Sequence, residues 1–479
     1  MKELYELSYT LNLLNWELKV SCPKDASDDL IDLISKYEEK LFILKSSDEY
    51  AEFLRNAKNL TEEEQRIVNN ELKNYERNKR VPKDFYVSYC KLKNKTNVIW
   101  REAKESNNYD LYKPYLKEMI EMTKKYYEYK NIENIPLYDL MISEYESGIN
   151  TKLIDQLFNE LKNEIIPIIK NYKGKIYPPY KKSYTDDELL ECSKYLLNYI
   201  GFDNDRGVVG IYPHGFTEKM GNDDIRITFS QTNNPIDFCA TVIHEGGHGI
   251  FEQHINKEYS KYSTDTMSHL FGLHESQSRF YENMLGRNKN FWIPIYDDIK
   301  KMLKLDIDID EFVNRLNTVK PSLIRTESDE LTYCLHIIIR YEIERDIFNG
   351  NIDVDNLNTL WNQKYKEYLG IDVPNDSVGI MQDVHWSEGE FGYFPSYLLG
   401  SIYDGMILEE IKNVNDILKE GKIKDITKYL NENIHINGGA YNSFEVIKRL
   451  TGKELSAKPL INYFKKKYDI LRFVNYNFL

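Results

Sequence analysis

The sequence predicts a mainly helical protein with one short stretch of β-structure. Apolar residues recur at steps of three and four in segments such as 27–44 and 305–319, which is the spacing of one face of an α-helix. Strand-like alternation is scarce and is clearest at 223–230. The 14 prolines and 23 glycines are spread along the 479 residues without a linker-like cluster, so we expect one continuous body.

Composition excludes several classes of protein. Hydrophobic residues make up 41% of the chain, which is enough for a large core. A net charge of −14 disfavours a nucleic-acid partner, because an acidic surface repels phosphates. No apolar run approaches the roughly 20 residues that span a bilayer, and Glu3 and Glu6 interrupt the region where a signal peptide would be apolar. Because the five widely spaced cysteines suit free thiols in a reducing compartment, we expect a cytoplasmic protein without a membrane partner.

The predicted strand leads directly into a helix. In DDIRITFS (223–230), three apolar side chains would face one way and the polar ones the other. A helix start signal follows, because Asn234 can cap the helix and Pro235 is tolerated in the first turn. Asp237 suits the positive end of the helix dipole. We expect the helix to continue through IDFCATVIHEGGHGIFEQH (236–254).

That helix contains His244-Glu245-Gly246-Gly247-His248, an HExxH sequence. Residues four apart lie on one face of a helix, about 40° apart around its axis and about 6 Å apart along it. Two imidazoles placed in this way can bind one Zn²⁺ ion. Glu245 would lie beside the metal without binding it, where it could take a proton from an activated water molecule. Each glycine inside a helix costs about 1 kcal/mol of stability relative to alanine. Two adjacent glycines are therefore hard to explain on an ordinary surface helix, and we expect another backbone or a substrate to approach closely there.

A third ligand is needed, because catalytic zinc normally has three protein ligands and one open position. The segment 267–286 is expected to form a second helix, and it contains Glu275. We assign Glu275 as the third ligand, with His274 as the local alternative. His244, His248 and Glu275 are therefore the predicted zinc site.

Four further blocks make the sequence similar to a known family. They occur in order as DxRxT at 224–228, HESQSR at 274–279, IRYEIE at 339–344 and GxxQDxHW at 379–386. With the HExGH block, they resemble the signatures of the carboxypeptidase Taq family of thermostable metallocarboxypeptidases. The flanking sequences are compatible, so the resemblance extends over essentially the whole chain.

The resemblance implies a gluzincin-like helical fold with a long substrate groove, a small β-sheet beside the metal and assembly as a homodimer. We expect a single metallocarboxypeptidase domain over residues 1–479. Within it, 1–200 would form a helical groove or lid part, 201–400 would carry the metal and substrate site, and 401–479 would add C-terminal helices. The implied activity is release of C-terminal amino acids from peptides with a free C-terminus. The implied cofactor is Zn²⁺, with Co²⁺ possible.

A carboxypeptidase must recognise a free carboxylate, which an arginine guanidinium does best through two parallel N–H donors. Arg340 is the first candidate, because it lies in the apolar helical segment CLHIIIRYEIE. The alternative is an internal pair with Glu344, four residues along the helix. Arg226, in the predicted strand, could hold substrate or brace Asp224.

The resemblance also implies roles for three other residues. His385 and Tyr397 are expected to donate to the oxyanion that develops during hydrolysis, although each could instead be a buried residue with a satisfied hydrogen bond. His214 is expected to contact substrate. The family usually has His-Pro-Phe here, and this chain has His214-Gly215-Phe216, which frees the backbone φ angle that proline would fix.

These residues predict a mechanism with two alternatives. Glu245 would remove a proton from the water that attacks the last peptide carbonyl, and it would then return the proton to the leaving amine. A metallo-oligopeptidase with the same metal core would cut internal bonds instead. A catalytically silent helical peptide-binding protein would bind without cutting.

Overall fold

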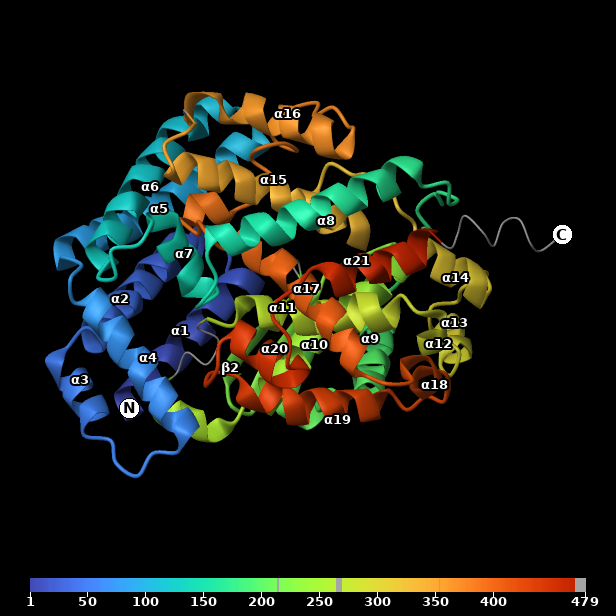
Figure 1. The fold of residues 1–479 in the computed structure, drawn as a ribbon, viewed down its shortest axis with the longest axis horizontal. Helices are drawn as coiled ribbons and strands as arrows, with labels where there is room; N and C mark the ends of the chain where they lie inside the picture. Colours follow the sequence, from blue (N-terminus) through green and yellow to red (C-terminus); the bar gives the residue numbers. More distant parts are fainter. Residues whose placement is uncertain (213–214, 264–268, 353, 470–479) are drawn as a thin grey trace. The chain divides into compact units, whose positions relative to one another are not determined.

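Helices account for most of the protein in the computed structural model, which describes residues 1–212, 215–263, 269–352 and 354–469 (Figure 1). One three-stranded sheet accompanies them. The predicted fold class, mainly α with a small β-sheet, is therefore confirmed. Within the described ranges, no helix is long and apolar enough to cross a membrane.

The chain folds into two compact units, and each is assembled from three separate segments. The first unit comprises Met1–Glu38, Gly174–Thr318 and Leu399–Leu460, and the second comprises Glu39–Lys173, Val319–Leu398 and Ile461–Leu479. Residues far apart in sequence therefore build each hydrophobic core. The single domain expected over 1–479, with its three consecutive parts, stays a prediction.

The first unit contains the sheet and the helices that surround it. Its elements are α1 (Lys2–Val20), η1 (Lys24–Ala26), α9 (Asp186–Ile200), η2 (Asn204–Arg206), β1 (Gly207–Ile211), β2 (Phe216–Gly221), β3 (Asp224–Phe229), α10 (Pro235–His254), η3 (Lys257–Lys261), α11 (Phe271–Arg279), η4 (Phe280–Gly286), α12 (Lys289–Trp292), α13 (Tyr296–Met302), α14 (Ile309–Leu316), α18 (Val414–Lys419), α19 (Ile423–Asn433), η8 (His435–Asn437) and α20 (Ser443–Thr451).

The second unit is helical in its described part. Its elements are α3 (Asp48–Arg55), α4 (Glu62–Asn78), α5 (Lys83–Glu105), α6 (Tyr109–Lys130), α7 (Leu137–Tyr145), α8 (Thr151–Asn171), η5 (Arg325–Glu327), α15 (Glu330–Phe348), η6 (Val354–Asn356), α16 (Leu357–Leu369), η7 (His385–Glu388) and η9 (Lys465–Asp469). The chain passes from one unit to the other within α2 (Ser27–Lys45), α17 (Phe394–Glu410) and α21 (Lys458–Phe464), and twice between helices, after residues 173 and 318.

The sheet has the strand order β1-β3-β2. β1 runs parallel to the central strand β3, and β2 runs antiparallel to it. β3 is the strand predicted at 223–230, and its apolar residues Ile225, Ile227 and Phe229 are all fully buried. The edge strands β1 and β2 were not predicted, because neither shows clear alternation in sequence.

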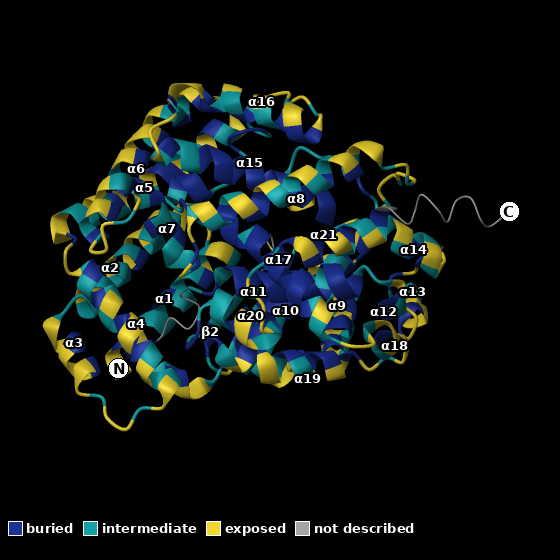
Figure 2. Cartoon of the chain, in the orientation of Figure 1, coloured by how far each residue is buried: buried dark blue, intermediate teal, exposed yellow. Residues whose placement is uncertain are grey.

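Helix α10 begins where the sequence predicts and is buried along most of its length (Figure 2). The Asn234 side chain caps it by accepting hydrogen bonds from the backbone N–H groups of Ile236 and Asp237. A Cβ atom on Gly246 would lie 2.5 Å from Cδ1 of Ile200 on α9. A Cβ atom on Gly247 would lie 2.7 Å from the backbone oxygen of Gln277 on α11. The two glycines therefore allow α10 to pack closely between two neighbouring helices.

Two predicted helices differ from the structure at their ends. In the described part of 267–286, helix α11 begins at Phe271 and widens into the π-helix η4 from Phe280 to Gly286. The segment predicted as helical at 305–319 is helical only over Ile309–Leu316. Asp308 is the reason, because its side chain accepts a hydrogen bond from the N–H of Glu311 and caps the helix at that point.

Helix α15 forms the interior of the second unit and is buried on all sides. Its polar side chains His336, Arg340 and Glu344 are each fully buried. Buried charges are costly unless they are paired. The partners of these residues therefore determine what the helix can do.

Candidate metal centre and substrate-binding residues

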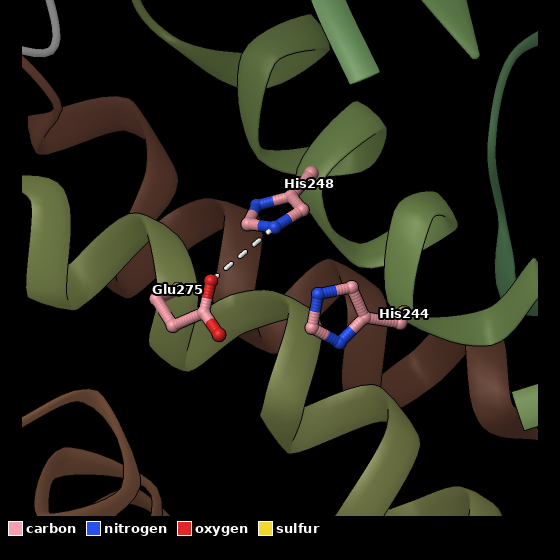
Figure 3. Close-up of side chains that lie close together, drawn as sticks. All are labelled: His244, His248 and Glu275. Atoms are coloured by element: carbon pink, nitrogen blue, oxygen red, sulfur yellow. Dashed lines mark ion pairs between the residues drawn. The ribbon is translucent and has the colours of Figure 1, made fainter. Parts of the chain in front are cut away.

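Three potential metal ligands point toward one another in the first unit (Figure 3). His244 and His248 extend from one face of α10, and Glu275 extends from α11. One ligand atom from each lies within 4.8 Å of the other two. His248 Nε2 lies 3.6 Å from Glu275 Oε2. Two ligands bound to tetrahedral zinc at 2.0–2.1 Å are about 3.4 Å apart, so the separation of His248 and Glu275 fits such an ion.

The ring of His244 is oriented by a carboxylate behind it. His244 Nδ1 lies 2.9 Å from Glu282 Oε2, so Nε2 is directed toward the other two ligands. The second oxygen of Glu282 accepts a hydrogen bond from Arg287 at 3.1 Å. Burial opposes ionisation of Glu282, but the bond with His244 and the charge of Arg287 outweigh it and lower its pKa to about 2. Glu282 is therefore a fixed anion of the kind that holds metal-ligating histidines in proteins.

The carboxylate of Glu275 is fixed in a similar way. Arg279 lies one turn along α11 and donates from Nε to Glu275 Oε1 at 2.6 Å. Oε2 is thereby left on the side of His248. A charge-assisted bond of this length constrains the carboxylate strongly, so Arg279 selects which oxygen faces the histidines.

His274, the alternative third ligand, is directed elsewhere. Its ring stacks on that of His248 with the centroids 4.2 Å apart. Its Nε2 lies 3.4 Å from Glu252 Oε1, which pairs it with a carboxylate on α10. Burial and then the charge of His274 lower the pKa of His248, so His248 is neutral, as a metal ligand must be. The structure therefore groups Glu275, and not His274, with the two histidines.

Glu245 lies beside this group and is bound by a residue of the sheet. Its Oε2 accepts a hydrogen bond of 2.7 Å from the hydroxyl of Thr217 on β2. Burial raises the pKa of Glu245, and the nearby His244 and the hydrogen bond from Thr217 partly oppose that rise. A carboxylate with a raised pKa is better matched to proton transfer near neutral pH than an exposed one.

Arg226 is engaged within its own strand. It donates from Nε to Asp224 Oδ1 at 3.0 Å and from an η nitrogen to Oδ2 at 2.8 Å. Its guanidinium also lies 5.4 Å from the ring centroid of Trp16. Of the two roles considered for Arg226, the structure shows the contact with Asp224. His214 lies outside the described residues.

Arg340 forms an ion pair inside the second unit. Its Nε donates to Asp383 Oδ2 at 2.6 Å, and an η nitrogen donates to the backbone oxygen of His336 at 2.8 Å. The residue is fully buried. Glu344, the alternative partner, instead accepts hydrogen bonds from Trp386, Tyr138 and the backbone of Gly392.

Asp383 joins Arg340 to a second arginine. Arg325 donates from Nε to Asp383 Oδ1 at 2.9 Å. Burial disfavours the charge on Asp383, but Arg340 and then Arg325 hold its pKa well below the usual range. The guanidinium of Arg325 also lies 5.0 Å from the ring centroid of Tyr397.

His385 and Tyr397 contact each other beside these arginines. His385 Nε2 lies 3.1 Å from the hydroxyl oxygen of Tyr397. Burial, and then the charge of Arg325, lower the pKa of His385 to about 3, so the imidazole is neutral. The structure thus groups His385, Tyr397, Arg325 and Arg340 within the second unit.

The comparisons with known proteins decide the family. A model of the carboxypeptidase Taq (M32) metallopeptidase family matches residues 1–468. The chain belongs to the M32 family. The predicted resemblance is confirmed, and this M32 protein is a metallocarboxypeptidase, a peptide hydrolase.

Relatives and solved structures of M32 proteins cover most of the chain. "Carboxypeptidase 1" of Bacillus subtilis is 37% identical over 489 aligned positions, which cover 98% of this chain and 97% of that protein. "Thermostable carboxypeptidase 1" of Thermus thermophilus is 31% identical and covers 83% of this chain and 81% of its own length. The crystal structure of an M32 carboxypeptidase from Deinococcus radiodurans has a TM-score of 0.92 at 27% identity, with 98% of this chain and 97% of that chain covered.

Sequence reasoning missed several residues of this M32 chain that contact a predicted metal ligand, the predicted base Glu245 or the Arg340 partner Asp383. Arg279 and Glu282 follow Glu275 by four and seven residues, a spacing that keeps side chains near one side of a helix and could have identified both. Thr217 and Arg325 offered no comparable signal. Each reaches its partner only through the tertiary fold.

Proposed function

We propose that this metallocarboxypeptidase uses a zinc ion held by His244, His248 and Glu275, with Glu245 as general base. The observation that carries the proposal is the convergence of three ligand atoms within 4.8 Å of one another. Glu282 and Arg279 support it, because each fixes one ligand from behind. Two imidazoles and one carboxylate are a ligand set that catalytic zinc uses in peptidases. Cobalt is the alternative ion, since it accepts the same donors.

When bound, a divalent metal at this site supplies Lewis-acid chemistry, which lowers the pKa of water and polarises a peptide carbonyl. The residues of the chain would then move the protons. Glu245 takes a proton from the attacking water at its carboxylate and returns it to the amine of the departing residue. Glu245 can do so because it is next to His244 on α10 without being one of the three grouped ligands.

Substrate binding by the second unit is a separate proposal. Arg340 was expected to grip the terminal carboxylate, but Asp383 and the oxygen of His336 engage its buried guanidinium. We therefore propose that Arg340 stabilises the second unit by pairing with Asp383, and that Arg325 is the arginine that contacts substrate. Arg325 is 8% exposed, whereas Arg340 is 0% exposed.

His385 and Tyr397 are proposed as neutral hydrogen-bond donors to the developing oxyanion. The low pKa of His385 supports a neutral role, because a charged imidazolium would not form at neutral pH. Substrate contacts by Arg226 and His214, a cytoplasmic location and a homodimer also stay predictions from the sequence and the family. Size-exclusion chromatography with light scattering tests the homodimer.

The experiment that tests the proposed function is mass spectrometry of a peptide mixture digested with the zinc-loaded protein. We expect ladders shortened only from the C-terminus. Matched peptides with an amidated C-terminus should be cleaved poorly, because they lack the terminal charge that an arginine recognises. Cleavage at internal bonds, equal on free and amidated peptides, would identify an oligopeptidase instead.

A further inference from the structure

The edge strand β2 presents alternating side chains to two different helices of the first unit. Phe216 contacts Trp16 on α1, with the ring centroids 5.4 Å apart. Thr217 faces the other way and bonds Glu245 on α10. Successive side chains of a strand point to opposite faces, so the pairing register of β2 determines that Thr217 faces α10.

The next residue on the same face repeats the pattern. Lys219 Nζ lies 3.1 Å from Glu252 Oε2, which is also on α10. The strand is thus attached to the helix at two points, and each joins a β2 side chain to a glutamate. The ion pair between Lys219 and Glu252 fixes the position of β2 against α10. The hydroxyl of Thr217 therefore lies within hydrogen-bond distance of the Glu245 carboxylate.

The hydroxyl of Thr217 has two acceptors and one proton. Its Oγ1 lies 2.7 Å from Glu245 Oε2 and 3.1 Å from the backbone oxygen of the same residue. The carboxylate is the shorter contact and the stronger acceptor. Among the described residues, Oε1 of Glu245 accepts no hydrogen bond. The two oxygens of Glu245 are therefore not equivalent.

We propose that Thr217 is a positioning residue for the general base: it holds Oε2 of Glu245, so that Oε1 is the oxygen that exchanges the proton. This inference rests on the proposed function. A carboxylate without such a contact can rotate about its side-chain torsions, and small losses of alignment at a reacting group cost about 10²-fold in rate. The hydrogen bond from the Thr217 hydroxyl restricts this rotation by holding Oε2, and it leaves Oε1 available for proton transfer.

The test compares Thr217→Val, which keeps the shape and loses the hydroxyl, with Thr217→Ser, which keeps the hydroxyl. A bond to a charged group corresponds to about 10- to 100-fold in rate, so we expect Thr217→Val to lower kcat by that factor with KM changed less than about threefold. Thr217→Ser should remain within about threefold of wild type. Metal content should be unchanged in both, because neither substitution touches a ligand.

Thr228→Val is the matched control. Thr228 lies on the neighbouring strand β3, and its hydroxyl contacts the backbone of Phe216 instead of Glu245. The Thr228→Val substitution removes one hydroxyl from the same sheet. It therefore measures any loss of activity that comes from weakening the sheet alone. We expect a smaller loss of kcat than in Thr217→Val.

Two further measurements separate positioning from structure. In a Glu245→Gln background, Thr217→Val should have less than about a twofold effect on kcat, because the group that it positions is already disabled. A crystal structure of Thr217→Val should show the Glu245 carboxylate displaced or in more than one orientation. Wild-type kcat in Thr217→Val, an equal loss in Thr228→Val, or full additivity with Glu245→Gln would overturn the proposal.

Failure of this inference is distinguishable from failure of the proposed function. If Glu245→Gln is inactive while Thr217→Val is fully active, the general base stands and only the role of Thr217 is wrong. If Glu245→Gln is itself active, the proposed base is wrong, and the inference is wrong with it.

Discussion

The two units bury charged groups in different ways. In the first unit, His244, His248 and Glu275 direct ligand atoms toward one another, and Glu282 and Arg279 hold His244 and Glu275 from the far side. In the second unit, Arg340 and Asp383 direct their charges at each other. Side chains that are held on their outer sides and direct ligand atoms toward one another have the arrangement that a metal site requires. In a buried ion pair whose partners face each other, each charge is instead already satisfied within the protein.

The largest effect that tests this contrast is expected in the first unit. Glu245→Gln should lower kcat by about 10²- to 10⁴-fold, the usual contribution of a general base, because the amide cannot accept the proton. Metal content measured by mass spectrometry should stay near the wild-type value. Near-normal turnover in this variant would remove Glu245 from the mechanism.

Arg340→Met tests whether the ion pair between Arg340 and Asp383 stabilises the second unit. Breaking a buried ion pair from one side costs about 3–5 kcal/mol, so chemical denaturation should show a loss of that order. Activity should fall equally on free and amidated peptides. Arg325→Met should instead lose activity mainly on peptides with a free C-terminus. A selective effect of Arg340→Met on free peptides would return the carboxylate contact to Arg340.

The sequence predicted the elements whose signals are local. Asn234 and Pro235 marked the start of α10, and the four-residue spacing of its histidines put both on one face. The partner of Arg340 could not be found in this way. Asp383 lies 43 residues away, so only the tertiary fold brings it to the guanidinium.

The edge strands show the same limit. β2 is short and carries Thr217, Glu218 and Lys219 in succession, which gives no clear alternation. It becomes a strand because it pairs with β3, and its polar residues find partners on two helices. Its contact with Glu245 therefore depends on the pairing register of β2, which no alternating apolar pattern in this strand reveals.

A moderate effect is expected on metal affinity when a residue that holds a predicted ligand is changed, such as Glu282, which contacts His244. Glu282→Gln should weaken zinc binding about 10- to 100-fold, as expected when the partner of a ligating histidine is altered. Glu275→Ala should weaken it more, because a ligand itself is lost. His274→Ala is the control and should largely retain zinc. Competition with a chelator measures all three, and the reverse order for Glu275 and His274 would reassign the third ligand.

The smallest effect concerns the pH dependence of stability in the second unit. Burial raises the pKa of Glu344 to about 7, although hydrogen bonds from Gly392, Trp386 and Tyr138 oppose the rise. A raised pKa means that the contribution of Glu344 to stability is full below its unfolded pKa, near 4.5, and is lost as the pH rises through about 7.

We therefore expect wild type to lose up to about 3 kcal/mol relative to Glu344→Gln between pH 5 and pH 8. Urea denaturation of the metal-free proteins at both pH values provides the measurement. Parallel pH profiles for the two proteins would show that Glu344 does not titrate in this range.

Gly247 has a consequence for the spacing between the helices that carry the three predicted ligands. A methyl group there would press on the backbone of Gln277 and Ser278, each 2.7 Å from the Cβ position. Those residues immediately follow Glu275 and Ser276 on α11. Any displacement of that backbone would carry the Glu275 carboxylate away from the two imidazoles of α10. The absence of a side chain at position 247 thus lets α11 lie close enough to α10 for Glu275 Oε2 to stand 3.6 Å from His248 Nε2, and a larger residue there would separate the two atoms.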